Sequence, residues 1–137
     1  MKRLLILAAF AAFVIFPAGA TADLFLKVTD HGTTCNVTST GTQVECAGKL
    51  SGLGSQTTVI NVSVPAGCTN NGGNNPPGQA KGSSGPIQPQ NGQVVFDVTT
   101  DPFKCPDDMK PFFGMTATLT VTQGGSIVFT EQVPISQ

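Results

Sequence analysis

Apolar and polar residues alternate with a period of two along most of the chain after residue 22. Successive side chains of a strand point to opposite faces, so this pattern predicts strands with one buried face. The expected strands cover residues 24–28, 33–39, 42–50, 56–64, 94–99, 115–122 and 126–133. No segment in this part of the chain carries apolar residues at helical spacing, so the sequence predicts an all-β protein.

About seven short alternating strands predict two packed antiparallel sheets, the immunoglobulin-like sandwich. Strand count alone does not separate this architecture from a small β-barrel, which stays open as the alternative. Antibody domains bury a tryptophan in the sandwich core, whereas this chain contains no tryptophan. The length of residues 23–137 suits a single domain.

The last two expected strands are joined by Gln123-Gly124-Gly125. Glycine reaches the positive φ that a tight turn requires, so this segment predicts a hairpin. In the last strand we expect Ile127, Phe129 and Val133 on the inner face, with Glu131 interrupting the apolar pattern.

Residues 67–92 form the irregular part of the sequence, built from Gly, Asn, Pro, Gln and Ser with Lys81 as its one charge. Long segments without strand or helix pattern are usually functional or disordered. We therefore expect a long loop, which is either a solvated spacer or a binding surface. A short edge strand near Pro86-Ile87-Gln88 is the one exception that the pattern allows.

The N-terminus has the pattern of a secretory signal. Lys2 and Arg3 precede an apolar run over residues 4–16, and Ala20-Thr21-Ala22 fits a signal-peptidase site. The apolar run is too short to cross the hydrocarbon core of a membrane. We expect residues 1–22 to be removed, which leaves one exported domain over residues 23–137.

The four cysteines of an exported chain predict two disulfides. A hairpin turning at residues 40–41 would place Cys35 opposite Cys46, and opposed residues of a hairpin share a face. We therefore expect the disulfide Cys35–Cys46 and, by elimination, Cys68–Cys105. The chain contains no Cys-x-x-Cys, which argues against a metal knuckle or a redox pair.

Removal of the signal changes the charge of the chain. Residues 23–137 keep five lysines, no arginine and eight acidic residues, so the net charge is 5 − 8 = −3. Binding to nucleic acid and to anionic lipid depends on Lys and Arg, so both are poor candidate partners. No later apolar run is long enough to span a membrane. We expect a monomer whose partner is an unidentified protein or surface ligand.

The sequence offers little catalytic chemistry. His31 is the only histidine, and no Gly-x-Ser-x-Gly elbow occurs, so a nucleophile with an adjacent base is not indicated. We predict no catalytic residues, no resident metal and no cofactor. A loop calcium site near Asp101, Asp107 and Asp108 stays open, although the spaced acidic pattern of a calcium loop is absent.

The candidate interaction residues are asparagines of the long loop and phenylalanines beside Cys105. They are Asn70, Asn71, Asn74, Asn75, Phe103, Phe112 and Phe113. The phenylalanines either cover one end of the core, which we favour, or form an exposed patch. Asn36 and Asn61 each begin an N-glycosylation acceptor pattern, and its use depends on the host.

Three segments carry a resemblance to known proteins. Residues 48–54 read GKLSGLG, residues 67–79 read GCTNNGGNNPPGQ, and residues 91–100 read NGQVVFDVTT before Cys105-Pro106. The chain resembles a group of small exported microbial proteins without assigned activity. The resemblance implies export and an immunoglobulin-like sandwich, and it carries no catalytic residues.

The expected disulfides and the lack of a catalytic set favour a non-enzymatic secreted or cell-envelope protein that acts in binding or surface interaction. Loops usually carry recognition, so residues 67–92 and 101–113 are the expected surfaces. The expected location is extracellular, or the periplasm or cell envelope of a Gram-negative host. A secreted hydrolase or hydrolase inhibitor is the second hypothesis, and a matrix or pilin-like subunit is the third.

Overall fold

A computed structural model describes residues 27–69 and 77–137. These residues form nine strands: β1 (Thr29–Asp30), β2 (Thr34–Val37), β3 (Val44–Ser51), β4 (Thr58–Thr69), β5 (Pro77–Ile87), β6 (Val94–Thr99), β7 (Lys110–Phe113), β8 (Thr116–Gln123) and β9 (Ser126–Ser136). The all-β prediction is confirmed, with nine strands instead of about seven. Within the described ranges, no helix is long and apolar enough to cross a membrane.

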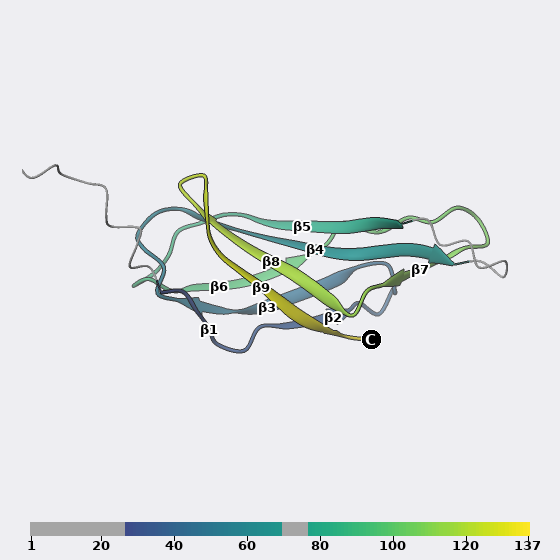
Figure 1. Cartoon of the computed structure of the whole chain (residues 1–137), viewed down its shortest axis with the longest axis horizontal. Coiled ribbons are helices and arrows are strands. Elements are labelled where there is room, and N and C mark those ends of the chain that lie inside the picture. The colour runs from purple at the N-terminus through teal and green to yellow at the C-terminus, as the bar shows by residue number, and fades with distance from the viewer. Residues whose placement is uncertain (1–26, 70–76) are drawn as a thin grey trace, which may run out of the picture.

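The strands form two sheets that enclose one core. In the first sheet β3 pairs antiparallel with β1 and β2 on one side and with β6 on the other. In the second sheet the order is β9-β8-β4-β5, and β7 pairs with the end of β4. Figure 1 shows β4 and β5 along one border of the molecule and β1, β2 and β3 along the other, with β8 and β9 crossing between them.

One side of this sandwich is closed by main-chain pairing. There β2 runs parallel to β9, with Cys35 beside Ile135 and Asn36 beside Ser136. The opposite side is open, because β6 and β5 end their respective sheets. The described strands therefore do not close into a barrel.

The core lies where the inner faces of the two sheets meet. Buried and exposed positions alternate along β4, β6 and β8, as the sequence pattern predicts. The largest fully buried apolar side chains are Leu50, Ile60, Leu119, Val44, Val62, Val64, Val94, Val98 and Val121. Burying such side chains stabilises each by about 1.5–3 kcal/mol, so this interior drives the folding of the domain.

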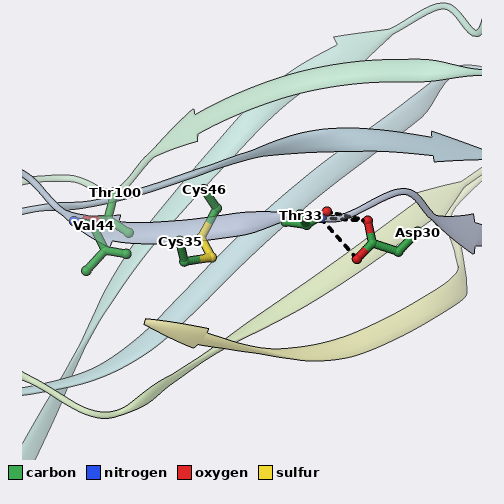
Figure 2. Close-up of a disulfide and its surroundings, with 6 residues drawn as sticks. All are labelled: Asp30, Thr33, Cys35, Val44, Cys46 and Thr100. Carbon is green, nitrogen blue, oxygen red and sulfur yellow. Dashed lines mark hydrogen bonds between the residues drawn. A yellow bond between two sulfur atoms is a disulfide. The ribbon is translucent and has the colours of Figure 1, made fainter. Parts of the chain in front are cut away.

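The predicted hairpin and both predicted disulfides are confirmed. β2 and β3 pair with Cys35 opposite Cys46 and Val37 opposite Val44, and Cys35 is bonded to Cys46 inside the core. Figure 2 shows this bridge between the two strands. The second bridge joins Cys68 at the end of β4 to Cys105, with a Cα–Cα distance of 5.7 Å. Two disulfides indicate an oxidising compartment, extracellular or periplasmic.

The predicted C-terminal hairpin is also present, with one difference in register. Gly124 and Gly125 form its turn with φ of 56° and 81°, the left-handed conformation that such a two-residue turn needs. Phe129 pairs with Val121 but Ile127 pairs with Thr122, so one extra residue bulges between them. The bulge turns Ile127 outward, where it is 67 % exposed, and its predicted inner position is therefore wrong.

The long loop predicted over residues 67–92 is wrong for most of its length. β4 continues to Thr69, and β5 occupies Pro77–Ile87 as a full partner of β4. The inner positions of β5 are small, with Ala80 buried and Gly82 half-buried. Small inner residues leave no apolar alternation, so the strand looks like a loop in the sequence. Among the described residues of this range, those from Gln88 to Gly92 form a loop that leads from β5 toward β6.

Two other expectations lie wholly or partly outside the described residues. The signal segment 1–22 and most of the first expected strand, 24–28, precede Lys27. Of that strand, Val28 is half-buried against the core, and regular pairing begins at β1.

Candidate functional site

A polar hollow of about 380 Å³ lies on the open side of the sandwich. It is lined by one residue of β4, three of β5, and two at the end of β6: Asn61, Lys81, Gly82, Ser83, Thr99 and Asp101. All of these residues except Gly82 are exposed. The hollow therefore presents one ammonium, one carboxylate, one amide and two hydroxyls to solvent.

Two close approaches between β5 and the end of β6 form the floor of the hollow. A Cβ at Gly82 would lie 2.7 Å from the carbonyl oxygen of Thr99, so only glycine fits there without displacing the backbone. One residue earlier in β5 and two residues after Thr99, the backbone N–H of Asp101 donates to the carbonyl of Lys81 at 2.9 Å. At these contacts the chain passes from the first sheet toward the second. They bring Asp101, just after β6, next to Lys81 of β5, although the two residues are far apart in sequence.

A bulge in β5 borders the same hollow. Val59 pairs with Pro86 and Asn61 pairs with Ser83, so two residues of β5 stand opposite Ile60. The backbone N–H of Ile60 donates instead to the hydroxyl of Ser84 at 3.0 Å. Bulges reorient nearby side chains and are frequent next to functional sites.

The groups of the hollow can hydrogen-bond a polar ligand but do not form a catalytic set. His31, the one histidine, lies beyond β1, and its Nε2 is 2.7 Å from the Ser51 hydroxyl. Both side chains lie where β1 pairs with the end of β3, and neither residue lines the hollow that contains Lys81 and Asp101. A nucleophile activated by a histidine requires both groups in one place, and His31 does not line the hollow.

The three acidic residues considered as a calcium site, Asp101, Asp107 and Asp108, do not form one cluster. Asp107 and Asp108 lie in a turn in which the N–H of Met109 donates to the Pro106 carbonyl, and Asp108 has a φ of 67°. Asp101 belongs to the hollow. In the described part of the chain, no three His, Cys, Asp or Glu residues are grouped to hold a metal ion.

The candidate phenylalanines gather at the end of the sandwich beside Cys105, but in different environments. β7 pairs with the last residues of β4, which places Phe113 opposite Ala66 and Phe112 opposite Gly67. Phe113 is buried in the core, Phe103 is half-buried against it, and Phe112 is 40 % exposed. The four candidate asparagines, Asn70, Asn71, Asn74 and Asn75, lie outside the described residues.

The Phe103 ring accounts for the glycine at position 78, near the start of β5. A Cβ at Gly78 would lie 3.0 Å from the Phe103 ring, so the ring packs closely over the β5 backbone. The backbone N–H of Phe103 donates to the Thr42 carbonyl at 2.8 Å. Phe103 therefore covers an end of the core, and Phe112 remains the exposed aromatic of this cluster.

Two pairs of carboxyl groups lie outside the hollow. Burial raises the pKa of Glu131, with the adjacent Asp30 carboxyl as the second cause, and Oε2 of Glu131 is buried without a hydrogen-bond partner among the described residues. On the outer face of the first sheet, a side-chain hydrogen bond with Asp97 and repulsion from it raise the pKa of Glu45. In both pairs, two carboxyl groups lie close together.

Comparison with known proteins adds no relative. No protein-family model matches the chain, and neither a curated protein nor a solved structure matches it.

The sequence indicated part of this site. Lys81, Gly82 and Ser83 come from the segment 67–92, and Asp101 opens the segment 101–113; both segments were expected surfaces. Asn61 was singled out only as a glycosylation acceptor, and Thr99 was not singled out at all. Their placement depends on the pairing of β4 with β5 and on the crossing at Gly82, which no local pattern encodes.

Proposed function

We propose that this chain is an exported, non-enzymatic protein with an immunoglobulin-like sandwich, and that it binds a polar ligand at the hollow around Lys81 and Asp101. The observation that carries the proposal is the hollow itself. It joins a cation, an anion and neutral hydrogen-bonding groups from three strands in one place. Sites of this composition orient a ligand through hydrogen bonds and discriminate by their geometry.

Export is supported by the signal-like N-terminus and by the disulfides. The immunoglobulin-like description is supported by the strand pairing, in which β3 pairs with β6 in one sheet and β9-β8-β4-β5 follow in the other. The shallow, open form of the hollow favours a group on a larger surface ligand over a fully enclosed small molecule.

The proposal is tested by affinity capture from the native extracellular or envelope material. The bait is the oxidised chain over residues 23–137, as wild type and as the double variant Lys81→Ala with Asp101→Ala. A matched control, Lys110→Ala with Asp107→Ala, removes the same two charges at exposed positions outside the hollow.

We expect the wild type and the control to retain the same material and the hollow variant to lose it. Equal retention by all three baits would refute a binding role for the hollow. Turnover of a substrate that survives in the hollow variant but not in His31→Ala would replace the proposal with the hydrolase hypothesis.

A further inference from the structure

The edge strand β6 has main-chain groups without a described partner on one side. Its even-numbered residues make the hydrogen bonds to β3, because the Thr100 N–H donates to the Val44 carbonyl and the register continues through Val98 and Cys46. In an antiparallel pair the intervening residues direct their N–H and C=O away from the partner strand. Val95 and Asp97 therefore point their main-chain groups away from β3, toward a side on which no described strand pairs with them.

The other described edges carry features that natural proteins use against strand pairing. β9 pairs with β2 only at Ile135 and Ser136, and the rest of that edge carries a bulge between Ile127 and Phe129 as well as Pro134. β1 has two residues, and β7 has four with Pro111 among them. β5 carries Lys81, a bulge and Pro86, and its Lys81 carbonyl already accepts from Asp101. β6 has six residues, of which five are β-branched or aromatic, and it contains neither proline nor a bulge. Val95 on its outer face is 75 % exposed.

The acidic residues beside the edge of β6 favour some added strands over others. Asp97 lies on the outer face of β6, next to Glu45 on β3. The nearest cation of the same face by register is Lys49, which stands opposite Val95, and the structure gives it no ion pair to Asp97. A second copy of this chain added through its own β6 would bring two such acidic pairs together, and repulsion disfavours that arrangement.

We propose that the free edge of β6 binds an extended segment of a partner protein by strand addition, with a Lys or Arg of that segment placed opposite Asp97. The segment would receive main-chain hydrogen bonds from Val95 and Asp97, which give affinity, while its alternate side chains give specificity. A residue directly opposite Asp97 lies within about 5 Å on the same face, close enough for a cation to neutralise the Glu45–Asp97 pair. This inference does not depend on the hollow.

The first test uses a seven-residue peptide in which a central lysine is flanked by alternating threonine and valine. The matched control peptide has glutamate in place of the lysine. Amide hydrogen exchange of the folded chain is followed by NMR with each peptide. We expect the lysine peptide to protect the Val95 and Asp97 amides, whereas the Phe96 and Val98 amides are already protected by β3.

Two variants separate strand addition from simple charge attraction. Val95→Pro removes an outward N–H without removing a hydrogen bond to β3, since proline is tolerated at such edge positions. We expect it to weaken peptide affinity by at least about tenfold while the unfolding temperature stays close to that of the wild type. Asp97→Asn should weaken it about two- to fivefold, the range of an exposed ion pair. Asp107→Asn is the matched control and should leave affinity unchanged.

Several outcomes would overturn the proposal. They are equal binding of the two peptides, undiminished affinity in both Val95→Pro and Asp97→Asn, absence of protection at Val95 and Asp97, and concentration-dependent self-association that Val95→Pro abolishes. The last outcome would instead identify a second copy of the chain as the occupant. The hollow variant, Lys81→Ala with Asp101→Ala, should bind the lysine peptide as the wild type does, so the two proposals fail independently.

Discussion

The hydroxyl of Thr100 accepts a hydrogen bond from the backbone N–H of Val44 at 3.0 Å, and both residues are fully buried (Figure 2). A side chain here replaces the main-chain carbonyl that would normally end the β3–β6 ladder. The Thr100 carbonyl turns aside and accepts from Gln43 Nε2 at 2.9 Å. This exchange lets the chain leave the first sheet, so that Asp101 reaches β5 and completes the hollow.

Replacing Thr100 by valine should therefore destabilise the fold. Valine keeps the shape but leaves the buried Val44 N–H without an acceptor, which costs about 1–3 kcal/mol. Urea unfolding of Thr100→Val and Thr100→Ser measures the effect. Serine retains the oxygen and should lose much less, and equal losses in the two variants would show that the hydrogen bond is unimportant.

Gly82→Ala should be destabilising although the substitution is small. The added methyl group would meet the Thr99 carbonyl, and relieving that overlap requires a backbone shift that costs about 1–3 kcal/mol. Ser83→Ala, at the exposed neighbouring position, should change the free energy of unfolding by less than about 0.5 kcal/mol. If the two variants unfolded at the same denaturant concentration, the close approach of β5 to β6 would be in doubt.

These contacts explain why the sequence predicts some elements and misses others. The β2–β3 and β8–β9 hairpins follow from local signals, namely the cysteine register and the glycine turn. β5 is stabilised by pairing with β4 and by room for Gly78 and Gly82 beneath Phe103 and Thr99, which are relationships between distant segments. The alternation of small residues at 78, 80, 82 and 84 is its one local signal, and an apolar pattern search overlooks it.

The two disulfides should contribute unequally to stability. In the chain-entropy model the shorter loop, with a sequence separation of 11, contributes about 3 kcal/mol, and the longer, with a separation of 37, about 4 kcal/mol. Paired Cys→Ser variants, Cys35 with Cys46 and Cys68 with Cys105, are compared by unfolding under non-reducing conditions. Peptide mapping without reduction checks the pairing, and a Cys35–Cys68 peptide would contradict the structure.

Stability should increase as the pH falls through the raised pKa of Glu131 toward the ordinary pKa of a carboxyl group. The pKa of Glu131 is raised in the folded state, first by burial and then by Asp30. The folded state therefore binds more protons than the unfolded state between the ordinary and the raised pKa, and the free energy of unfolding decreases as pH rises through that window. The pKa of Glu45 is also raised, by Asp97, so its effect on stability has the same direction.

Urea midpoints measured between pH 5 and 7.5 test this expectation. Glu131→Gln removes the charge and supplies an amide donor to Asp30, so it should unfold at higher urea than the wild type at pH 7.5 and show a weaker dependence on pH. His31 is next to Asp30 in sequence, so His31→Gln is measured in parallel. Asp107→Asn removes one exposed charge elsewhere and is the control; a pH dependence shared by every variant would exclude Glu131 as its source.

The parallel contact of β2 with β9 has a mechanical consequence. A force applied outward at the two ends of the domain pulls β2 toward its N-terminal end and β9 toward its C-terminal end. Because the strands are parallel, this loads their hydrogen bonds in shear, all at once instead of one after another. The bond between Cys35 and Cys46 ties the loaded strand to β3, and the bond between Cys68 and Cys105 limits how far the chain can extend after rupture. Traction between the two ends of the domain would therefore meet this short parallel contact in the direction in which it resists most.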